Sequence, residues 1–177
     1  PQRSHSSGRH GPDQGLVRER ADRLAGAVVE DLADPFRVSD ISAADIKNNP
    51  ALLLDEAAAL SMTSGKRIVR IRGANEDQVE VFTALFSIEE PLSLVIAEAG
   101  ELRPRSPLRA LFEEYSDAAA VGCYLDDASG IDDLIQDIIE LNPDMIINDI
   151  LNTRREDVMS LKDRNIKVVN FLILISI

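Results

Sequence analysis

Tryptophan is absent from this chain of 177 residues, and aromatic residues make up only 4% of it. A hydrophobic core must therefore consist mostly of Leu, Ile, Val and Ala, for which the 45% hydrophobic content is sufficient. Long apolar runs are also missing. The longest, FLILI at residues 171–175, is far shorter than the roughly 20 residues of a membrane-spanning helix. With no signal-peptide pattern either, the composition predicts a soluble globular protein without membrane contact.

Cysteine and histidine are nearly absent, which limits the chemistry available. Cys123 is the single cysteine, so an internal disulfide is excluded and a reducing cytosol is favoured. Its apolar surroundings at residues 118–124 predict a buried structural thiol rather than a nucleophile. Both histidines, His5 and His10, lie in a polar tract at residues 1–10 that we expect to be disordered. We therefore expect no catalytic residues, and the histidines lack neighbouring metal ligands.

Basic residues are outnumbered by acidic residues, 19 to 31, which gives a net charge of −12. A surface this acidic does not bind nucleic acid as a whole, because phosphate contacts require clustered Lys and Arg. The basic clusters, typical of solvated faces, are Arg67, Arg70 and Arg72, and Arg103, Arg105 and Arg109. The acid pairs at residues 126–127 and 132–133 flank helix starts, where the helix dipole favours carboxylates, so we expect no metal site there.

Strand and helix patterns alternate along residues 11–127. Ser42 and Asp45 have capping-box spacing, and Ser106-Pro107 is typical of an N-cap followed by a first helical residue. The alternation predicts a parallel, doubly wound α/β sheet with helices on both faces. The strands are expected near residues 36–41, 67–72, 92–97 and 118–124. After residue 126 the pattern predicts helices and then an apolar tail, with a domain boundary near residues 127–130.

Residues 49–72 predict a helix, a short loop and a strand. Asn49 has the chemistry of an N-cap, Pro50 fits the first helical position, and the helical pattern stops at Leu60. The loop that follows, SMTSG at residues 61–65, contains one large apolar residue, Met62. Met62 either forms an exposed tip that docks onto a partner or packs back into the core, and the local sequence leaves both possibilities open.

A phosphate-binding loop is also missing. Such a loop requires G-x-x-x-x-G-K-[ST], whereas here Gly11 and Gly15 are one residue too close and Leu16-Val17 follows them. The strand at residues 94–99 carries a single acid, Glu98. We therefore expect no bound nucleotide or other cofactor and no ATP hydrolysis. A nucleotide-binding ATPase domain of doubly wound fold remains the alternative function, and a generic α/β signalling module is a third.

Five blocks of the sequence, in this order, resemble the N-terminal part of the delta subunit of bacterial DNA polymerase III, the clamp-loader subunit, in its alphaproteobacterial form. The resemblance covers about two thirds of the chain. The blocks are GPDQGLVRERA (residues 11–21), ADPFRVSDI (33–41), LLLDEAAALSMTSGKRIVRIRGA (52–74), LVIAEAGELRPRSPLRALFEE (94–114) and AAAVGCYLDD (118–127).

The resemblance implies an AAA+-like domain without a functional phosphate loop at residues 11–127, followed at residues 128–177 by part of a small helical lid domain and a divergent tail. It implies a bacterial cytoplasmic protein of DNA replication that binds and opens the DNA sliding clamp. Its other partners are clamp-loader subunits, with DNA contacted only within the assembled complex. The resemblance also implies that the chain itself is non-catalytic, although it would belong to a holoenzyme that is a DNA-directed DNA polymerase, a nucleotidyltransferase. Residue by residue, the clamp-binding element falls on Leu60, Ser61, Met62 and Thr63.

The sequence departs from the family pattern in three places. The family has an apolar strand before the GPD block, where residues 4–10 are polar. Thr63 stands where an aromatic residue is common, and residues 166–177 do not match the lid. The chain starts in a polar tract and stops in an apolar one, and it contains no counterpart of the family's collar domain. We therefore interpret the chain as a fragment.

Overall fold

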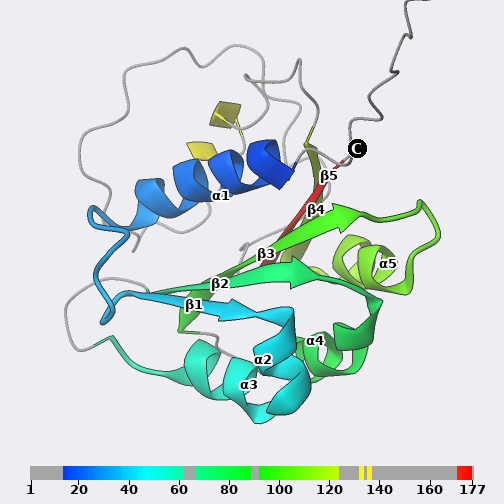
Figure 1. Cartoon of the computed structure of the whole chain (residues 1–177), viewed down its shortest axis with the longest axis horizontal. Helices are drawn as coiled ribbons and strands as arrows, with labels where there is room; N and C mark the ends of the chain where they lie inside the picture. Colours follow the sequence, from blue (N-terminus) through cyan, green and yellow to red (C-terminus); the bar gives the residue numbers. More distant parts are fainter. Residues whose placement is uncertain are drawn as a thin grey trace, which may run out of the picture.

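The computed structural model describes residues 14–61, 67–88, 92–123, 132–133, 135–136 and 171–176. Its centre is a five-stranded sheet in which all neighbouring strands are parallel, in the order β1-β2-β3-β5-β4 (Figure 1). The α/β class and the parallel sheet predicted from the sequence are thus confirmed. The strands are β1 (Val38–Ser42), β2 (Arg67–Ala74), β3 (Ser93–Glu101), β4 (Ala118–Cys123) and β5 (Phe171–Ser176).

Helices cover both faces of the sheet. One face packs against α1, which lies above the sheet in Figure 1, and the other packs against α2 to α5. A 3₁₀ turn, η1, precedes α4 after Gly73, whose φ of 71° is a conformation that glycine adopts without strain. The helices are α1 (Gln14–Val28), α2 (Ala43–Asn48), α3 (Ala51–Ala58), η1 (Glu76–Gln78), α4 (Val79–Phe86) and α5 (Pro107–Glu114).

Local capping explains where several helices begin. The capping box of α2 is confirmed, because the Ser42 hydroxyl accepts from the Asp45 backbone N–H and the Asp45 carboxylate accepts from the Ser42 N–H. Pro107 is the first residue of α5, as predicted. The start of α3 differs by one residue: Pro50 is its N-cap, without a side-chain hydrogen bond, so the N-cap role assigned to Asn49 is wrong.

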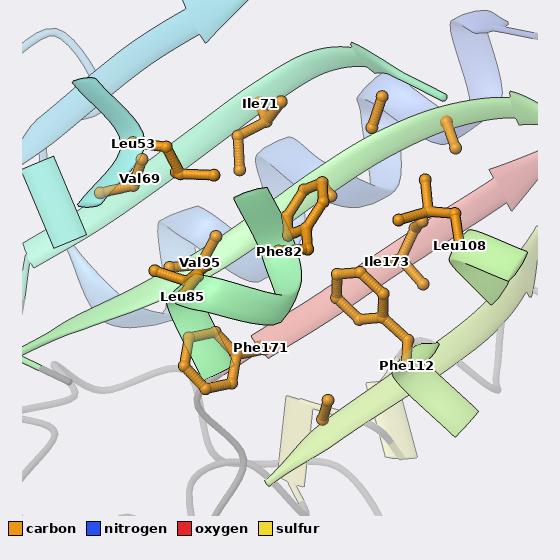
Figure 2. Packing of buried hydrophobic residues seen from close by; sticks show 14 of the residues in the cluster. Leu53, Val69, Ile71, Phe82, Leu85, Val95, Leu108, Phe112, Phe171 and Ile173 are labelled. Atoms are coloured by element: carbon orange, nitrogen blue, oxygen red, sulfur yellow. The ribbon is translucent and has the colours of Figure 1, made fainter. Parts of the chain in front are cut away.

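The core consists of two apolar layers, one on each face of the sheet. Strand β3 is buried along almost its whole length on both faces, as its non-alternating sequence predicts. Figure 2 shows the layer beneath α2 to α5, where Phe82, Leu85, Leu108 and Phe112 from α4 and α5 lie against Val69, Val95 and Ile173 of the strands. Such close packing fixes the ends of the strands and the loops that leave them.

Strand β5 is the element that the sequence did not predict. It lies between β3 and β4, with Phe171 opposite both Val95 and Ala118. Leu172 and Leu174 face the α1 side, while Phe171, Ile173 and Ile175 face the other helices. Residues 171–176, which we expected to form an apolar tail after a helical lid, therefore belong to the sheet. Most of residues 128–170, where the lid is expected, lie outside the described residues, as does the tract at residues 1–10.

Candidate docking site at the amino ends of strands β1 and β2

The predicted docking residues follow α3 on the side of the sheet where β1 and β2 start. Leu60 is 76% exposed, and Ser61 is half-buried. Met62 and Thr63 lie outside the described residues, so the two possibilities for Met62 are not distinguished. The helix ends at Ala58, two residues before the end predicted from the sequence, and Ala59 is extended. Leu60 is thus an exposed apolar residue on the segment that leaves α3.

Helix α3, which precedes Leu60, is held in place by packing against the sheet. Leu53 and Ala57 are fully buried against the sheet, and the backbone N–H of Ala59 closes the last turn on the carbonyl of Glu56 at 3.4 Å. A helix anchored in this way does not rotate freely, because rotation would expose the buried leucine to water. The position from which Leu60 extends is therefore set by core packing.

Arg67, the first residue of β2, ties this helix to the segment before β1. Its Nη1 donates to the backbone oxygen of Glu56 at 3.1 Å, and its Nη2 bonds the Glu56 carboxylate at 3.0 Å. Its Nε donates to the backbone oxygen of Phe36 at 3.1 Å. The side chain is 9% exposed. A guanidinium suits this position because it holds several acceptors in one plane, and the Glu56 carbonyl lies at the negative end of a helix.

A second exposed apolar residue is Phe36, whose exposure was not predicted from the sequence. It is 58% exposed, although the alternating pattern predicted that a strand starts there. In the structure β1 starts at Val38, because Asp34 organises a turn instead. The Asp34 carboxylate accepts from the Phe36 N–H at 2.8 Å, and its backbone oxygen accepts from the Val38 N–H at 2.9 Å. The Asp34-Pro35 pair is the sequence signal for such a turn.

The β2 arginines do not form a solvated basic face. Arg70 is buried and bonds Glu98 at 2.8 Å and Asp22 of α1 at 2.7 Å, with Asp40 3.8 Å away. Burial alone lowers the pKa of Arg70, but Glu98 and Asp22 outweigh it, so the pKa is raised and the side chain remains charged. The expectation of a solvated face is thus wrong for Arg67 and Arg70, whose charges are used in internal ion pairs.

The remaining candidate residues form no evident chemical site. Arg109 pairs with Glu113 one turn along α5 at 2.7 Å. Cys123 is buried, as predicted. Asp132 pairs with Arg23, whereas residues 126–127 lie outside the described part of the chain. Within that described part no group of three or more His, Cys, Asp or Glu side chains is placed to hold a metal ion.

The wider comparisons add no identification. Among the helices that the structure describes, none is both long and apolar enough to cross a membrane. Searches against protein-family models, curated proteins and solved structures find no match.

Proposed function

We propose that this chain is part of a clamp-loader delta subunit and binds the DNA sliding clamp during replication, within the DNA polymerase III holoenzyme. The observation that supports the proposal is the exposure of Leu60, two residues after a helix whose own leucines are buried or half-buried. The sequence resemblance assigns clamp binding to this position and to Ser61, Met62 and Thr63. The role is mechanical rather than catalytic: the apolar residues enter a pocket on the clamp and favour the open ring.

We also propose that the α/β domain is AAA+-like and is followed by a lid. An AAA+-like, doubly wound domain without a phosphate loop is supported by a parallel sheet with helices on both faces. It is also supported by the absence of Lys and Ser/Thr after Gly15. We assign the region after residue 127, apart from β5, to a partial helical lid. The bacterial cytoplasm is the compartment that this function requires.

Energetics favour Leu60 as a docking residue. Burying a leucine side chain contributes about 1.5–3 kcal/mol relative to leaving it in water. A partner that supplies an apolar pocket therefore gains roughly ten- to a hundredfold in affinity from this one side chain. The gain is largest when the residue extends from a rigid element, because less conformational entropy is lost on binding.

A direct binding measurement with purified bacterial sliding clamp tests the proposal. Surface plasmon resonance is expected to show that the wild type binds, and that Leu60→Asp or Met62→Asp weakens binding by tenfold or more, because a carboxylate in an apolar pocket is left without a partner. The matched control is Ala44→Asp, which adds the same charge at an exposed position in the first turn of α2. If the wild type does not bind, or if all three variants bind like it, the proposal is rejected.

A further inference from the structure

We propose that Phe36 is a second docking residue on the surface that contains Leu60, and that Arg67 holds the two in register. This inference rests on the proposed function, because it extends the same clamp-binding surface to a residue outside the segment at residues 60–63. The surface is defined here by Phe36, Leu60 and the acidic residues Asp31 and Asp55. The segment before β1, which contains Phe36, and the segment after α3, which contains Leu60, lie on the left of Figure 1, where β1 and β2 start.

Phe36 differs from every other phenylalanine in the chain. The sequence contains five, and the other four, Phe82, Phe86, Phe112 and Phe171, are buried in one cluster of contacting rings. Their ring centroids lie 4.6 to 6.3 Å apart. A protein with so few aromatic residues leaves one of them 58% exposed to water. Exposed aromatic side chains are enriched among the residues that dominate protein interfaces.

The backbone of Phe36 is fixed on both sides, so its exposure does not come from a loose segment. Its N–H is held by the Asp34 carboxylate at 2.8 Å, and its carbonyl oxygen is held by Arg67 Nε at 3.1 Å. The next two N–H groups, of Arg37 and Val38, donate to the Asp34 carbonyl at 3.1 and 2.9 Å. A phenyl ring on such a backbone is preorganised, and little ordering entropy is lost when a partner covers it.

Arg67 connects Phe36 to the helix that precedes Leu60. The same guanidinium bonds the backbone oxygens of Phe36 and Glu56, each at 3.1 Å, and Leu60 follows Glu56 by four residues. The spacing of the two apolar residues is therefore determined by one buried side chain and not only by the separate packing of two segments. This arrangement suits a partner surface with two apolar recesses at a fixed separation.

Acidic side chains are exposed on the segments near the two apolar residues, and they indicate the charge expected on the partner. Glu30 and Asp31 are exposed on the segment that contains Phe36, and Asp55 is exposed on the last turn of α3. Opposite charges across an interface increase the association rate and fix the orientation of the partners. The surface therefore fits a clamp face in which apolar recesses are flanked by Lys or Arg side chains.

The experiment compares clamp affinities of the wild type, Phe36→Ala, Leu60→Ala and the double variant. Phe36→Ala is expected to weaken binding by about tenfold, comparable to Leu60→Ala, while the melting temperature changes little because Phe36 is already 58% exposed to water. Leu102→Ala, a half-buried leucine just after β3 at the opposite ends of the strands, is the control and is expected to bind like the wild type.

The role of Arg67 is tested by coupling. Arg67→Met is expected to weaken clamp binding in the wild-type background and to add little in the Phe36→Ala background, whereas a merely structural role would give the same loss in both. Arg67→Lys restores part of the affinity, because it keeps the charge but not the planar set of donors. Equal losses in the two backgrounds would show that Arg67 does not act through Phe36.

The contribution of the acidic residues to clamp binding is tested with two charge-reversal variants. Asp55→Lys is expected to lower the association rate at low salt, and Glu101→Lys, an exposed acid at the end of β3, is expected to leave it unchanged. If Leu60→Ala weakens binding but Phe36→Ala does not, the inference is wrong and the proposed function stands. If the wild type does not bind the clamp, both are wrong.

Discussion

At the scale of single residues, Arg70 forms ion pairs with three acidic residues, Asp22, Asp40 and Glu98. Its side chain is 5% exposed and bonds Glu98, whose side chain is 10% exposed, as well as Asp22. A buried ion pair contributes little net stability when both members are replaced, but removal of one member leaves an uncompensated charge. The pair joins β2 to β3, and Asp22 extends the contact to α1.

We predict that Arg70→Met lowers the free energy of unfolding by about 3–5 kcal/mol, because Glu98 is left charged and without its partner. Arg70→Met combined with Glu98→Leu is expected to recover much of the loss. Arg72→Met is the control: Arg72 pairs with Asp40 at 2.8 Å while both side chains are 40% or more exposed, and it should cost at most about 1 kcal/mol. Urea denaturation of the four proteins measures these differences. Equal losses for Arg70→Met and Arg72→Met would contradict the buried pair.

The Asp45 carboxylate is expected to make the stability of the protein depend on pH in acid. Hydrogen bonds from the hydroxyl and the backbone N–H of Ser42 lower the pKa of Asp45 below its usual 3.8. The ionised carboxylate therefore stabilises the folded state at and above about pH 5, and this contribution is lost as the pH falls through the lowered pKa. The difference in unfolding free energy between the wild type and Asp45→Ala should be constant near neutral pH and should shrink below about pH 4. A difference that does not depend on pH would exclude this capping carboxylate as the source.

At the scale of elements, the contact between α4, α5 and β5 depends on aromatic packing. Phe86 of α4 lies 4.6 Å from Phe171, 4.7 Å from Tyr115 and 5.0 Å from Phe112, measured between ring centroids. We predict that Phe86→Ala lowers the unfolding free energy by about 3–5 kcal/mol, because a cavity replaces the shared ring. Phe36→Ala, which removes the same atoms from an exposed position, should change stability by less than about 0.5 kcal/mol. Thermal and urea denaturation compare the two variants, and similar losses for both would contradict the core assignment.

Elements with a local signal were predictable from the sequence. The capping box at Ser42 and Asp45 and the proline that starts α5 depend on residues within one turn, and they occur where predicted. The exposure of Phe36 was missed because alternating apolar residues outweighed the turn signal of Asp34-Pro35. The burial of Arg67 and Arg70 was missed because their acidic partners, Glu56 and Glu98, lie 11 and 28 residues away in sequence. The geometry of the proposed docking surface thus depends on contacts that no local pattern encodes.

At the scale of the whole molecule, β5 completes the sheet. Along the chain, α5 connects β3 directly to β4. The last strand of the described residues, β5, then lies between these two earlier strands. Its six residues are all buried, and every backbone position pairs with a strand on either side. An apolar run of this kind has no local indication of its partners, because its pairing is set by residues some 50 to 75 positions earlier.

We predict that Ile173→Asp abolishes cooperative unfolding, because an unpaired carboxylate in the centre of a sheet costs several kcal/mol, a large part of the total stability of roughly 5–15 kcal/mol. Ile173→Val is the matched control and should cost only about 0.5–1.5 kcal/mol, since it removes one methylene and keeps the strand apolar. Circular dichroism during urea denaturation distinguishes the two outcomes. If Ile173→Asp unfolds within about 1 kcal/mol of the wild type, β5 does not lie between β3 and β4. The proposed clamp binding should fail together with folding in Ile173→Asp and persist in Ile173→Val, because the proposed docking surface of Phe36 and Leu60 requires the intact sheet behind it.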